Sequence, residues 1–570
     1  MSTALTAGVT GLQAHQKMLD VTGNNLANVN TTAFKASKVN FAELFSQTVA
    51  DASSPSSTVG GTNPQQMGSG VSINSITRDT TQGNIIKTGN PLDAAIEGEG
   101  FFTLYDGEKA VFTRAGTFSV DESNTLVEVG TGYRVQRIGQ TGEGDNFQIP
   151  GDSNIYIPYD KPIEPNATTE ITLSGNLSSD QSFETAQSQV LNSSITFTTG
   201  GGTEAANTTT LSSLDQLTSG TISDDSTITL SGYTHDGTQI TGTTAVINVT
   251  GATTLSELAS SIETAIENFG TGTDVTVSIT NGKIRITDNE SGYSKLDVGM
   301  TWADTTNNSA VTLPGYFEYT TVGGEEVKDV NIAVYDHLGT KYTMAGAFVR
   351  TNTENQWDFV LSNITGPSNT SIDQITADNR RVSGLDFNAN NGTFAGLNSA
   401  IGDTSAFYIT FDSEVGAQTI SLDFGIAGQF SGITQVAGTS TAVATDQDGY
   451  AEGNLSSLSI DNSGVIVGSF SNGERRNIAM IQLSIFDNAM GLESIGKGFF
   501  TPTVNSGTPV GVEAMTSGAG KIYGSSLEKS NADVADEFVN LIQAQNGYQA
   551  NARTIRVANE ILQELTNLIR

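Results

Sequence analysis

Apolar residues recur at helical spacing at both ends of the chain, and this pattern limits the possible folds more than any other feature of the sequence. Near the N-terminus a leucine returns every seven residues, at Leu5, Leu12, Leu19 and Leu26. Near the C-terminus the same interval relates Leu541, Tyr548, Ile555 and Leu562, with Phe538 three residues earlier. A seven-residue interval is typical of a helix that packs lengthwise against another helix. We therefore predict two terminal helices that form a coiled-coil-like pair.

A simpler interpretation is that both segments are amphipathic helices on an ordinary globular core. The length of the C-terminal pattern argues against it, because about 36 residues correspond to a helix of about 54 Å. Both segments also border Ser/Gly-rich, turn-prone sequence, at 51–70 and 517–526. Gly547 interrupts the C-terminal pattern and costs about 1 kcal/mol relative to alanine inside a helix, so we expect a local bend there.

The long middle of the chain favours β-structure. Only 36% of the 570 residues are hydrophobic, and Gly, Ser, Thr and Asn are abundant between the ends. Turn dipeptides separate runs of β-branched and aromatic residues at Asp106-Gly107, Asn281-Gly282, Ser463-Gly464 and Asn472-Gly473. Such dipeptides predict β-hairpins. The chain is too long for one core, so the fold class that we predict is multidomain and mainly β, with paired terminal helices.

A short motif that occurs twice in the sequence suggests that the domains are nested. Ile96-Glu-Gly-Glu-Gly-Phe-Phe102 near the beginning resembles Ile495-Gly-Lys-Gly-Phe-Phe500 near the end. Similar strand entries on both sides of a long insertion suggest one domain built from both. The domains that we predict are a terminal helical domain (1–75 plus 526–570), an inner β-domain (76–150 plus 445–525), an outer β-domain (151–190 plus 311–444) and an inserted outermost α+β module (191–310).

The inserted module shows the one clear helical period of the interior, at 253–266. Thr254 is a candidate N-cap, and Glu257 follows at the spacing of a capping box. Two alternating segments come next, 275–279 and 284–287, separated by Asn281-Gly282. The pattern predicts one helix followed by a β-hairpin.

Several classes of chemistry receive no support from the sequence. The absence of cysteine removes disulfides, thiolate metal sites and cysteine nucleophiles. The three histidines, His15, His235 and His337, stand at no metal-ligand spacing. The Gly98-Glu-Gly100 segment lacks the Lys-Ser/Thr of a phosphate loop, and Asp446-Gln-Asp448-Gly449 lacks the spacing of a calcium loop. We predict no catalytic, cofactor or metal site and no enzymatic activity.

The charge and the hydropathy of the chain also exclude some partners. The formal net charge of -35 opposes binding to nucleic acid. No stretch approaches the roughly 20 apolar residues of a membrane span, and the first residues lack the features of a cleaved signal peptide. We therefore expect neither nucleic-acid binding nor membrane insertion, and either a cytoplasmic location or export without a cleaved signal.

The amino-acid sequences of both terminal segments resemble the signatures of flagellar rod and hook proteins. The N-terminal likeness is carried by residues 11–31, from Gly-Leu-Gln-Ala-His to Asn-Leu-Ala-Asn-Val-Asn-Thr. The C-terminal likeness is carried by 527–531, 536–542 and 548–552. Interior segments at 330–349 and 468–507 resemble hook proteins, whereas 160–320 is poorly matched. Ala33, Ala532 and Asn546-Gly547 depart from the family pattern.

The resemblance implies a structural subunit of the bacterial flagellar hook, which polymerises into a flexible tubular joint that passes torque from rod to filament. It implies paired terminal helices along a central channel, with Leu5, Leu12, Leu19 and Leu26 meeting Phe538, Leu541, Tyr548, Ile555 and Leu562 within or between subunits. It also implies an extracellular location, export by the flagellar apparatus without a cleaved signal, and rod proteins, hook-associated proteins and the hook cap as partners.

Two alternatives stay open. A distal-rod or hook-associated protein would carry the same ends but form straight or capping structures, and the length of this chain favours the hook. A secreted acidic adhesin or carbohydrate-active protein would need a cleft with converging carboxylates, to which nothing in the sequence points.

Overall fold

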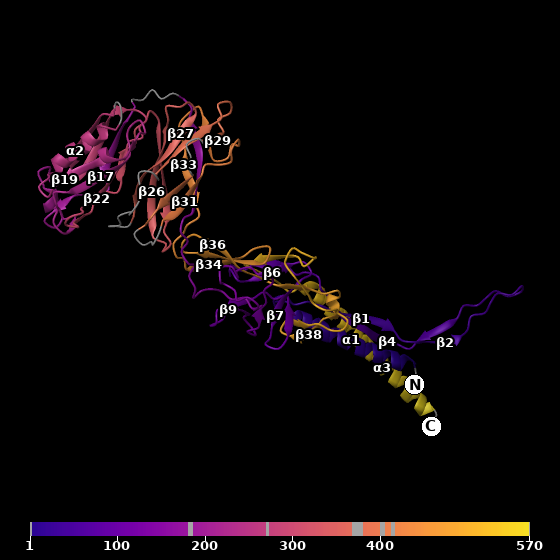
Figure 1. Cartoon of the computed structure of the whole chain (residues 1–570). Coiled ribbons are helices and arrows are strands. Elements are labelled where there is room, and N and C mark those ends of the chain that lie inside the picture. Colours follow the sequence, from indigo (N-terminus) through magenta and orange to yellow (C-terminus); the bar gives the residue numbers. More distant parts are fainter. Residues whose placement is uncertain are drawn as a thin grey trace. The chain divides into compact units, whose positions relative to one another are not determined.

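The computed structural model describes residues 3–180, 186–269, 273–366, 380–398, 405–411 and 417–568. The chain divides into two compact units, one formed by 1–163 and 453–570 and the other by 164–452 (Figure 1). The described residues contain three α-helices, α1 (Thr3–Ala27), α2 (Leu255–Glu267) and α3 (Val534–Leu568), and many short strands. The predicted fold class, mainly β with the two terminal helices packed together, is confirmed.

In the first unit, strands from the early and late parts of the chain pair with each other. Strand β7 (Phe101–Tyr105) pairs with β37 (Leu483–Ile485), and β8 (Ala110–Thr113) pairs with β39 (Phe499–Thr501). The two Gly-Phe-Phe segments thereby meet, with the rings of Phe101 and Phe500 5.8 Å apart. The aromatic side chains that meet here form a small core of their own. The domain boundaries given above stay predictions.

Further strands complete the first unit. Two of its pairs again join the early and late parts of the chain: β5 (Ile85–Lys87) with β42 (Ser526–Glu528), and β6 (Ala94–Glu97) with β41 (Lys521–Gly524). The other strands are β9 (Phe118–Val120), β10 (Leu126–Glu128), β11 (Arg134–Val135), β34 (Leu455–Ile460), β35 (Val465–Phe470), β36 (Arg475–Met480), β38 (Glu493–Gly496) and β40 (Val510–Val512).

In the second unit, two sheets enclose an aromatic core. The first contains β25 (Val327–Tyr335), β26 (Lys341–Arg350), β27 (Gln356–Thr365), β28 (Arg381–Phe387) and β29 (Phe394–Leu397). The second contains β12 (Glu170–Ser178), β30 (Ala406–Ile409), β31 (Gln418–Asp423), β32 (Ile433–Val436) and β33 (Val443–Gln447). Trp357 is fully buried among phenylalanines of both sheets, so its use is core packing.

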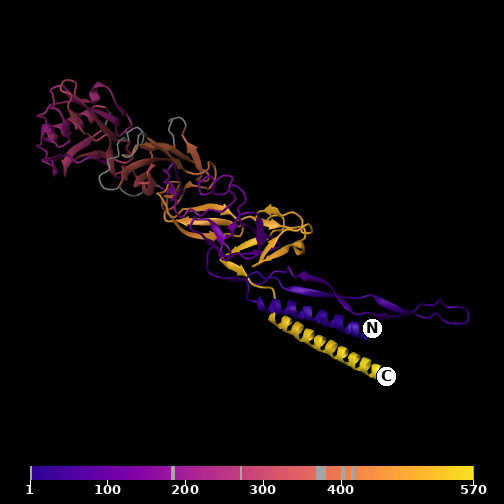
Figure 2. The same cartoon turned by 90° about the horizontal axis from the view of Figure 1, so that it is seen from below.

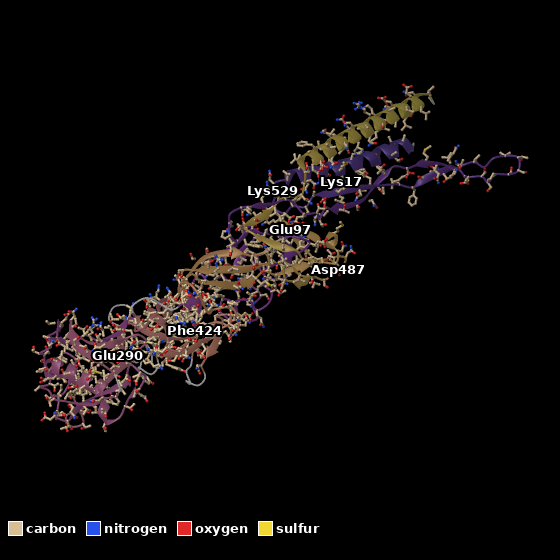
Figure 3. The ribbon with its side chains drawn as sticks, turned by 90° about the horizontal axis from the view of Figure 1, so that it is seen from above. Lys17, Glu97, Glu290, Phe424, Asp487 and Lys529 are labelled. Atoms are coloured by element: carbon tan, nitrogen blue, oxygen red, sulfur yellow. The ribbon has the colours of Figure 1, made fainter. Side chains whose placement is uncertain are left out.

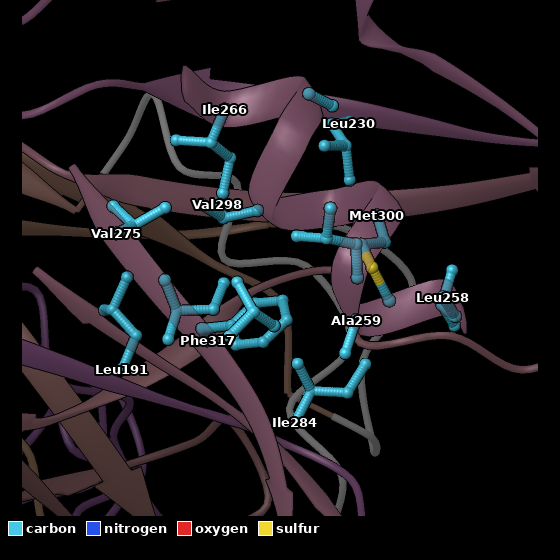
Figure 4. Packing of buried hydrophobic residues seen from close by; sticks show 14 of the residues in the cluster. Leu191, Leu230, Leu258, Ala259, Ile266, Val275, Ile284, Val298, Met300 and Phe317 are labelled. Atoms are coloured by element: carbon cyan, nitrogen blue, oxygen red, sulfur yellow. The ribbon is translucent and has the colours of Figure 1, made fainter. Parts of the chain in front are cut away.

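The predicted capping box and hairpin of the interior are confirmed. The Thr254 side chain accepts from the Glu257 backbone N–H, and the Glu257 carboxylate accepts from the Thr254 N–H at 2.8 Å. Strand β20 (Val275–Thr280) pairs with β21 (Lys283–Ser291) through Asn281 and Gly282, both at positive φ. Positive φ at both central positions is what a type I′ turn requires. Figure 4 shows the core that α2 covers, with Leu258 and Ile266 among its residues.

The same part of the second unit holds further strands. The longer ones are β13 (Ser188–Ser193), β17 (Ser226–Tyr233), β19 (Val246–Val249), β22 (Asp297–Ala303) and β24 (Phe317–Thr321). The short ones are β14 (Thr198–Thr199), β15 (Thr203–Glu204), β16 (Leu217–Ser219), β18 (Gln239–Ile240) and β23 (Ala310–Val311).

A buried ion pair ties this α+β region to the sheet of β25–β29. The Arg380 guanidinium donates to the Asp297 carboxylate from Nε at 2.5 Å and from Nη2 at 2.7 Å. The guanidinium also lies 4.1 Å from the centre of the Tyr319 ring. Ala347, Val349 and Val360 of the sheet belong to the core that α2 covers. The two regions therefore share both apolar core and a bidentate charge pair, which is the strong form of such contacts.

Candidate assembly interface

The two terminal helices form an antiparallel pair in which small residues allow close approach. Figure 2 shows α1 and α3 side by side, with the N- and C-termini at the same end. A Cβ atom added at Gly8 would lie 3.0 Å from Ile555, and one at Gly11 would lie 2.7 Å from Asn551. Gly8 and Gly11, which lower helix propensity, therefore serve close packing.

Gly547 has the same use on the other helix. A Cβ at this position would lie 2.4 Å from Cε1 of the His15 ring. Helix α3 continues through Gly547 without interruption. The glycine is thus explained by the imidazole that lies against it, and the expected local bend is not needed to account for it.

The structure places the nine predicted interface residues at different depths. Six are half-buried: Leu5, Leu12, Leu19, Leu26, Leu541 and Ile555. Three are exposed: Phe538, Tyr548 and Leu562. The most buried apolar residues of the helix pair are instead small, Ala14, Ala544 and Ala558. A role in contacts between subunits stays a prediction for all nine.

Helix α3 exposes many large apolar side chains in the single chain. Phe538 is 49% exposed and Ile561 is 62% exposed. The others are Val534, Val539, Ile542, Tyr548, Val557, Leu562, Leu565 and Leu568. Isolated exposed apolar residues are ordinary, but a set of this size along one helix is typical of a surface that another protein covers. We call these residues the apolar surface of α3.

A projecting β-hairpin follows α1, and the sequence did not predict it. Strand β1 (Ser37–Glu43) pairs with β4 (Val71–Arg78), and beyond them β2 (Ser46–Ala50) pairs with β3 (Gln65–Gly68). Figures 1 and 2 show the outer part projecting from the rest of its unit. Phe45 is 93% exposed, and every residue of β2 and β3 is exposed. Exposed apolar residues on an isolated two-stranded hairpin need a partner surface for stability.

The base of this hairpin packs against α1. The Thr10 hydroxyl lies 3.4 Å from the backbone N of Val71, for which it is the acceptor, and the His15 and Phe41 rings are 6.0 Å apart. The base of the hairpin, where β1 pairs with β4, therefore packs against α1. The sequence signal for it is weak, because the alternation of Val71 and Ile73 with serine and asparagine breaks before Ile76 and follows Ser/Gly-rich sequence.

The buried side chain of Asn25 joins α1 to the start of β1 and to the start of α3. Asn25 Nδ2 donates to the Glu537 carboxylate and to the Ser37 carbonyl, each at 2.8 Å. Asn25 Oδ1 accepts from the Ser37 N–H at 2.9 Å. One side chain thus joins α1, α3 and β1. Buried polar groups with satisfied hydrogen bonds specify a single arrangement, which apolar packing alone does less well.

Asn531 makes a comparable set of bonds before α3 begins. Its Oδ1 accepts from the Ala36 N–H at 2.8 Å, and its Nδ2 donates to the carbonyls of Asp79 and Thr81, each at 3.0 Å. Both asparagines lie in the segments that carry the family likeness, but their roles were not predicted.

The buried carboxylate of Glu528 joins three segments of the first unit. Glu528 Oε1 accepts from Lys35 Nζ at 2.7 Å and from the Gly83 N–H at 2.8 Å. Both charged side chains are at most 5% exposed. Burial lowers the pKa of the Lys35 ammonium, and the charge of Glu528 opposes this shift. The ion pair links the start of the hairpin to the strand that leads into α3.

The described residues show no candidate metal site. Among them, no three His, Asp or Glu side chains come together in a group that could hold a metal ion. Asp448 accepts from the backbone N–H groups of Thr169 and Glu170, at 2.7 and 3.0 Å, which is a structural use. No helix of the described chain is both long and apolar enough to cross a membrane.

Four protein families match separate parts of the chain. Residues 5–35 match "Flagella basal body rod protein", and residues 524–568 match "Flagellar basal body rod FlgEFG protein C-terminal". Residues 95–178 match "Flagellar hook protein FlgE/F/G D1 domain", and residues 307–450 match "Flagellar basal body protein FlaE D2 domain".

Similar proteins cover the chain to different extents. The chain is 30% identical to the flagellar hook protein FlgE of Borreliella burgdorferi and to that of Treponema pallidum, with all of each protein covered in both comparisons. It is 40% identical to the flagellar basal-body rod protein FlgG of Bacillus subtilis over 156 residues, which are 27% of this chain and 57% of that protein. The likeness to the hook proteins therefore extends over the whole chain, and the likeness to the rod protein does not.

Proposed function

The chain belongs to the flagellar hook protein family and is a structural subunit of the bacterial flagellum, and we propose that it polymerises through its helix pair into the flexible tube of the hook. The observation that carries this proposal is the apolar surface of α3, which a single chain leaves in water. Each side chain that becomes fully buried contributes about 1.5 to 3 kcal/mol. Several such contacts per subunit, repeated along a helical lattice, would hold a polymer.

The remaining parts of the proposal concern location and partners. In it the subunit lies outside the cell in the hook, reaches that place through the flagellar export apparatus without a cleaved signal, and has no catalytic activity. Its partners are further copies of itself, the rod and hook-associated proteins at the two ends of the tube, and the hook cap during growth. The projecting hairpin provides a second surface for contact between copies, because Phe45 and Val59 are exposed on it.

Two substitutions on the exposed side of α3 test the proposal. We expect Phe538→Asp and Leu562→Asp to prevent formation of tubes by the purified protein, because a carboxylate would be buried without a partner at each contact. Both residues are 40% exposed or more in the single chain, so the monomer should unfold at an unchanged temperature. Electron microscopy and sedimentation measure the polymer, and calorimetry measures the monomer.

The matched control is Gln563→Asp, which adds the same charge at an exposed polar position next to Leu562. It should form tubes at a concentration close to that of the unaltered protein. Curved tubes from the unaltered protein agree with a hook subunit, whereas short straight or capping structures would favour the distal-rod or hook-associated alternative. Normal tubes from both Asp variants would refute a role for the apolar surface of α3.

A further inference from the structure

A pocket of about 610 Å³ in the first unit has a buried arginine in its wall. Glu99, Phe101, Phe486, Asp487 and Ser517 are among its other lining residues, and Figure 3 labels Asp487 on this unit. Gly98 forms part of the wall, and Gly100 lies between the lining residues Glu99 and Phe101. A Cβ at either glycine would come within 2.7 Å of the chain at Ala519 and Gly520, so close backbone contact closes that side.

The arginine, Arg114, lacks a close partner for its charge. It is 4% exposed, and neither Nε nor Nη1 makes a hydrogen bond. The nearest carboxylate oxygen belongs to Glu528 and is 3.9 Å from Nη1, beyond hydrogen-bond distance. The guanidinium lies over the Phe101 ring at 4.9 Å from its centre. This ring contact holds the guanidinium in place but supplies no acceptor for Nε or Nη1.

Two buried cations, Lys35 and Arg114, lie near the buried carboxylate of Glu528, while the exposed Glu99 also lines the pocket. Glu528 is already bound by Lys35 at 2.7 Å, so two buried cations share one buried carboxylate. Burial lowers the pKa of Arg114, while Glu528 and Glu99 oppose that shift. The guanidinium nevertheless stays charged at neutral pH. A buried charge without a hydrogen-bonded partner is costly, and the missing partner here is an anion.

We propose that this pocket takes up a carboxylate side chain of a second copy of the chain. The inference rests on the proposed polymer and names one of its contacts. A guanidinium is suited to a carboxylate because its planar donors match both oxygens. The chain itself supplies carboxylates in excess, with 61 Asp and Glu against 26 Lys and Arg. A neighbouring copy is therefore the source that charge complementarity favours.

The rival occupant is Glu99 of the same chain, which is exposed and lines the pocket. Crosslinking distinguishes the two. In an Arg114→Lys variant, a carbodiimide joins the new amine to any carboxylate in direct contact. Polymer is grown from equal parts of ¹⁴N- and ¹⁵N-labelled protein and analysed by mass spectrometry. We expect peptides at position 114 that join the two isotopes, in polymer and not in monomer. Crosslinks only within one chain would overturn the inference.

Assembly measurements give a second test. Arg114→Met removes a buried charge that has no hydrogen-bonded partner and leaves Glu528 bound to Lys35, so the monomer should unfold at an unchanged or higher temperature. We expect the critical concentration for assembly to rise at least tenfold. Glu99→Gln should assemble as the unaltered protein does. A normal critical concentration for Arg114→Met, or the same defect in Glu99→Gln, would overturn the inference while the polymer itself remained established. Absence of any polymer would overturn both.

Discussion

Gly547→Leu is expected to prevent assembly of the subunit or to raise its critical concentration at least about tenfold. The new side chain would enter the space of the His15 imidazole, because even a Cβ would lie 2.4 Å from that ring. Overpacking of this kind costs about 1 to 3 kcal/mol, and a tenfold change in an equilibrium constant corresponds to about 1.4 kcal/mol. Since α1 and α3 pair along this contact, the helices would separate or shift. Sedimentation of polymer against total protein concentration gives the critical concentration.

Two further variants identify the cause of this effect. His15→Ala combined with Gly547→Ala should restore assembly, because the alanine at 547 then meets open space and favours the helix. Gly23→Ala is the matched control, since a Cβ at Gly23 meets no atom within 4 Å. That substitution should stabilise α1 by about 1 kcal/mol and leave assembly intact. An assembly defect in the His15→Ala/Gly547→Ala pair as large as that of Gly547→Leu would contradict the close-packing account.

Glu528→Gln should lower the free energy of unfolding of the first unit by about 3 to 5 kcal/mol. The substitution leaves Lys35 and Arg114 as buried cations without a carboxylate, and breaking a buried pair from one side has a cost of this size. Chemical denaturation followed by near-ultraviolet circular dichroism measures the change. The second unit should unfold as before, so a biphasic transition would separate the two contributions.

Glu97→Gln serves as the control for Glu528→Gln. Glu97 pairs with Lys521 at 2.8 Å, a distance similar to that of the buried pair, but both side chains are largely exposed. Water screens and replaces such contacts, so we expect no measurable change in stability. Equal losses of unfolding free energy in Glu97→Gln and Glu528→Gln would contradict the view that burial of Glu528 makes its charge important for stability.

Local sequence signals predicted the elements whose structure depends on neighbouring residues. The capping box at Thr254 and the turn at Asn281-Gly282 involve residues within a few positions of each other, and both are confirmed. The seven-residue interval of leucines predicted terminal helices that pack together, which is also confirmed. In each example the physics that fixes the element acts within one turn or one helix face.

Individual side-chain contacts between distant residues escaped prediction, although the pairing of the two ends of the chain did not. Lys35 and Glu528 are 493 residues apart, and no local sequence pattern near either residue indicates that they pair. The periodicity of apolar residues drew attention to leucines, whereas the closest helix contacts involve Gly547 and His15, whose fit depends on three-dimensional shape. The hairpin of β2 and β3 lies next to turn-prone sequence, and its strands are exposed on all sides, so no alternation of buried and exposed residues marks them.

A cysteine-labelling experiment tests most directly whether the apolar surface of α3 is buried between subunits. The chain contains no cysteine, so an Ile561→Cys variant carries a single reactive thiol. Ile561 is 62% exposed in the single chain, and a maleimide should react quickly with the monomer. The proposed assembly predicts labelling at least tenfold slower in polymer than in monomer. Equal rates in polymer and monomer would show that this surface stays in water and would contradict the proposed role of the helix pair.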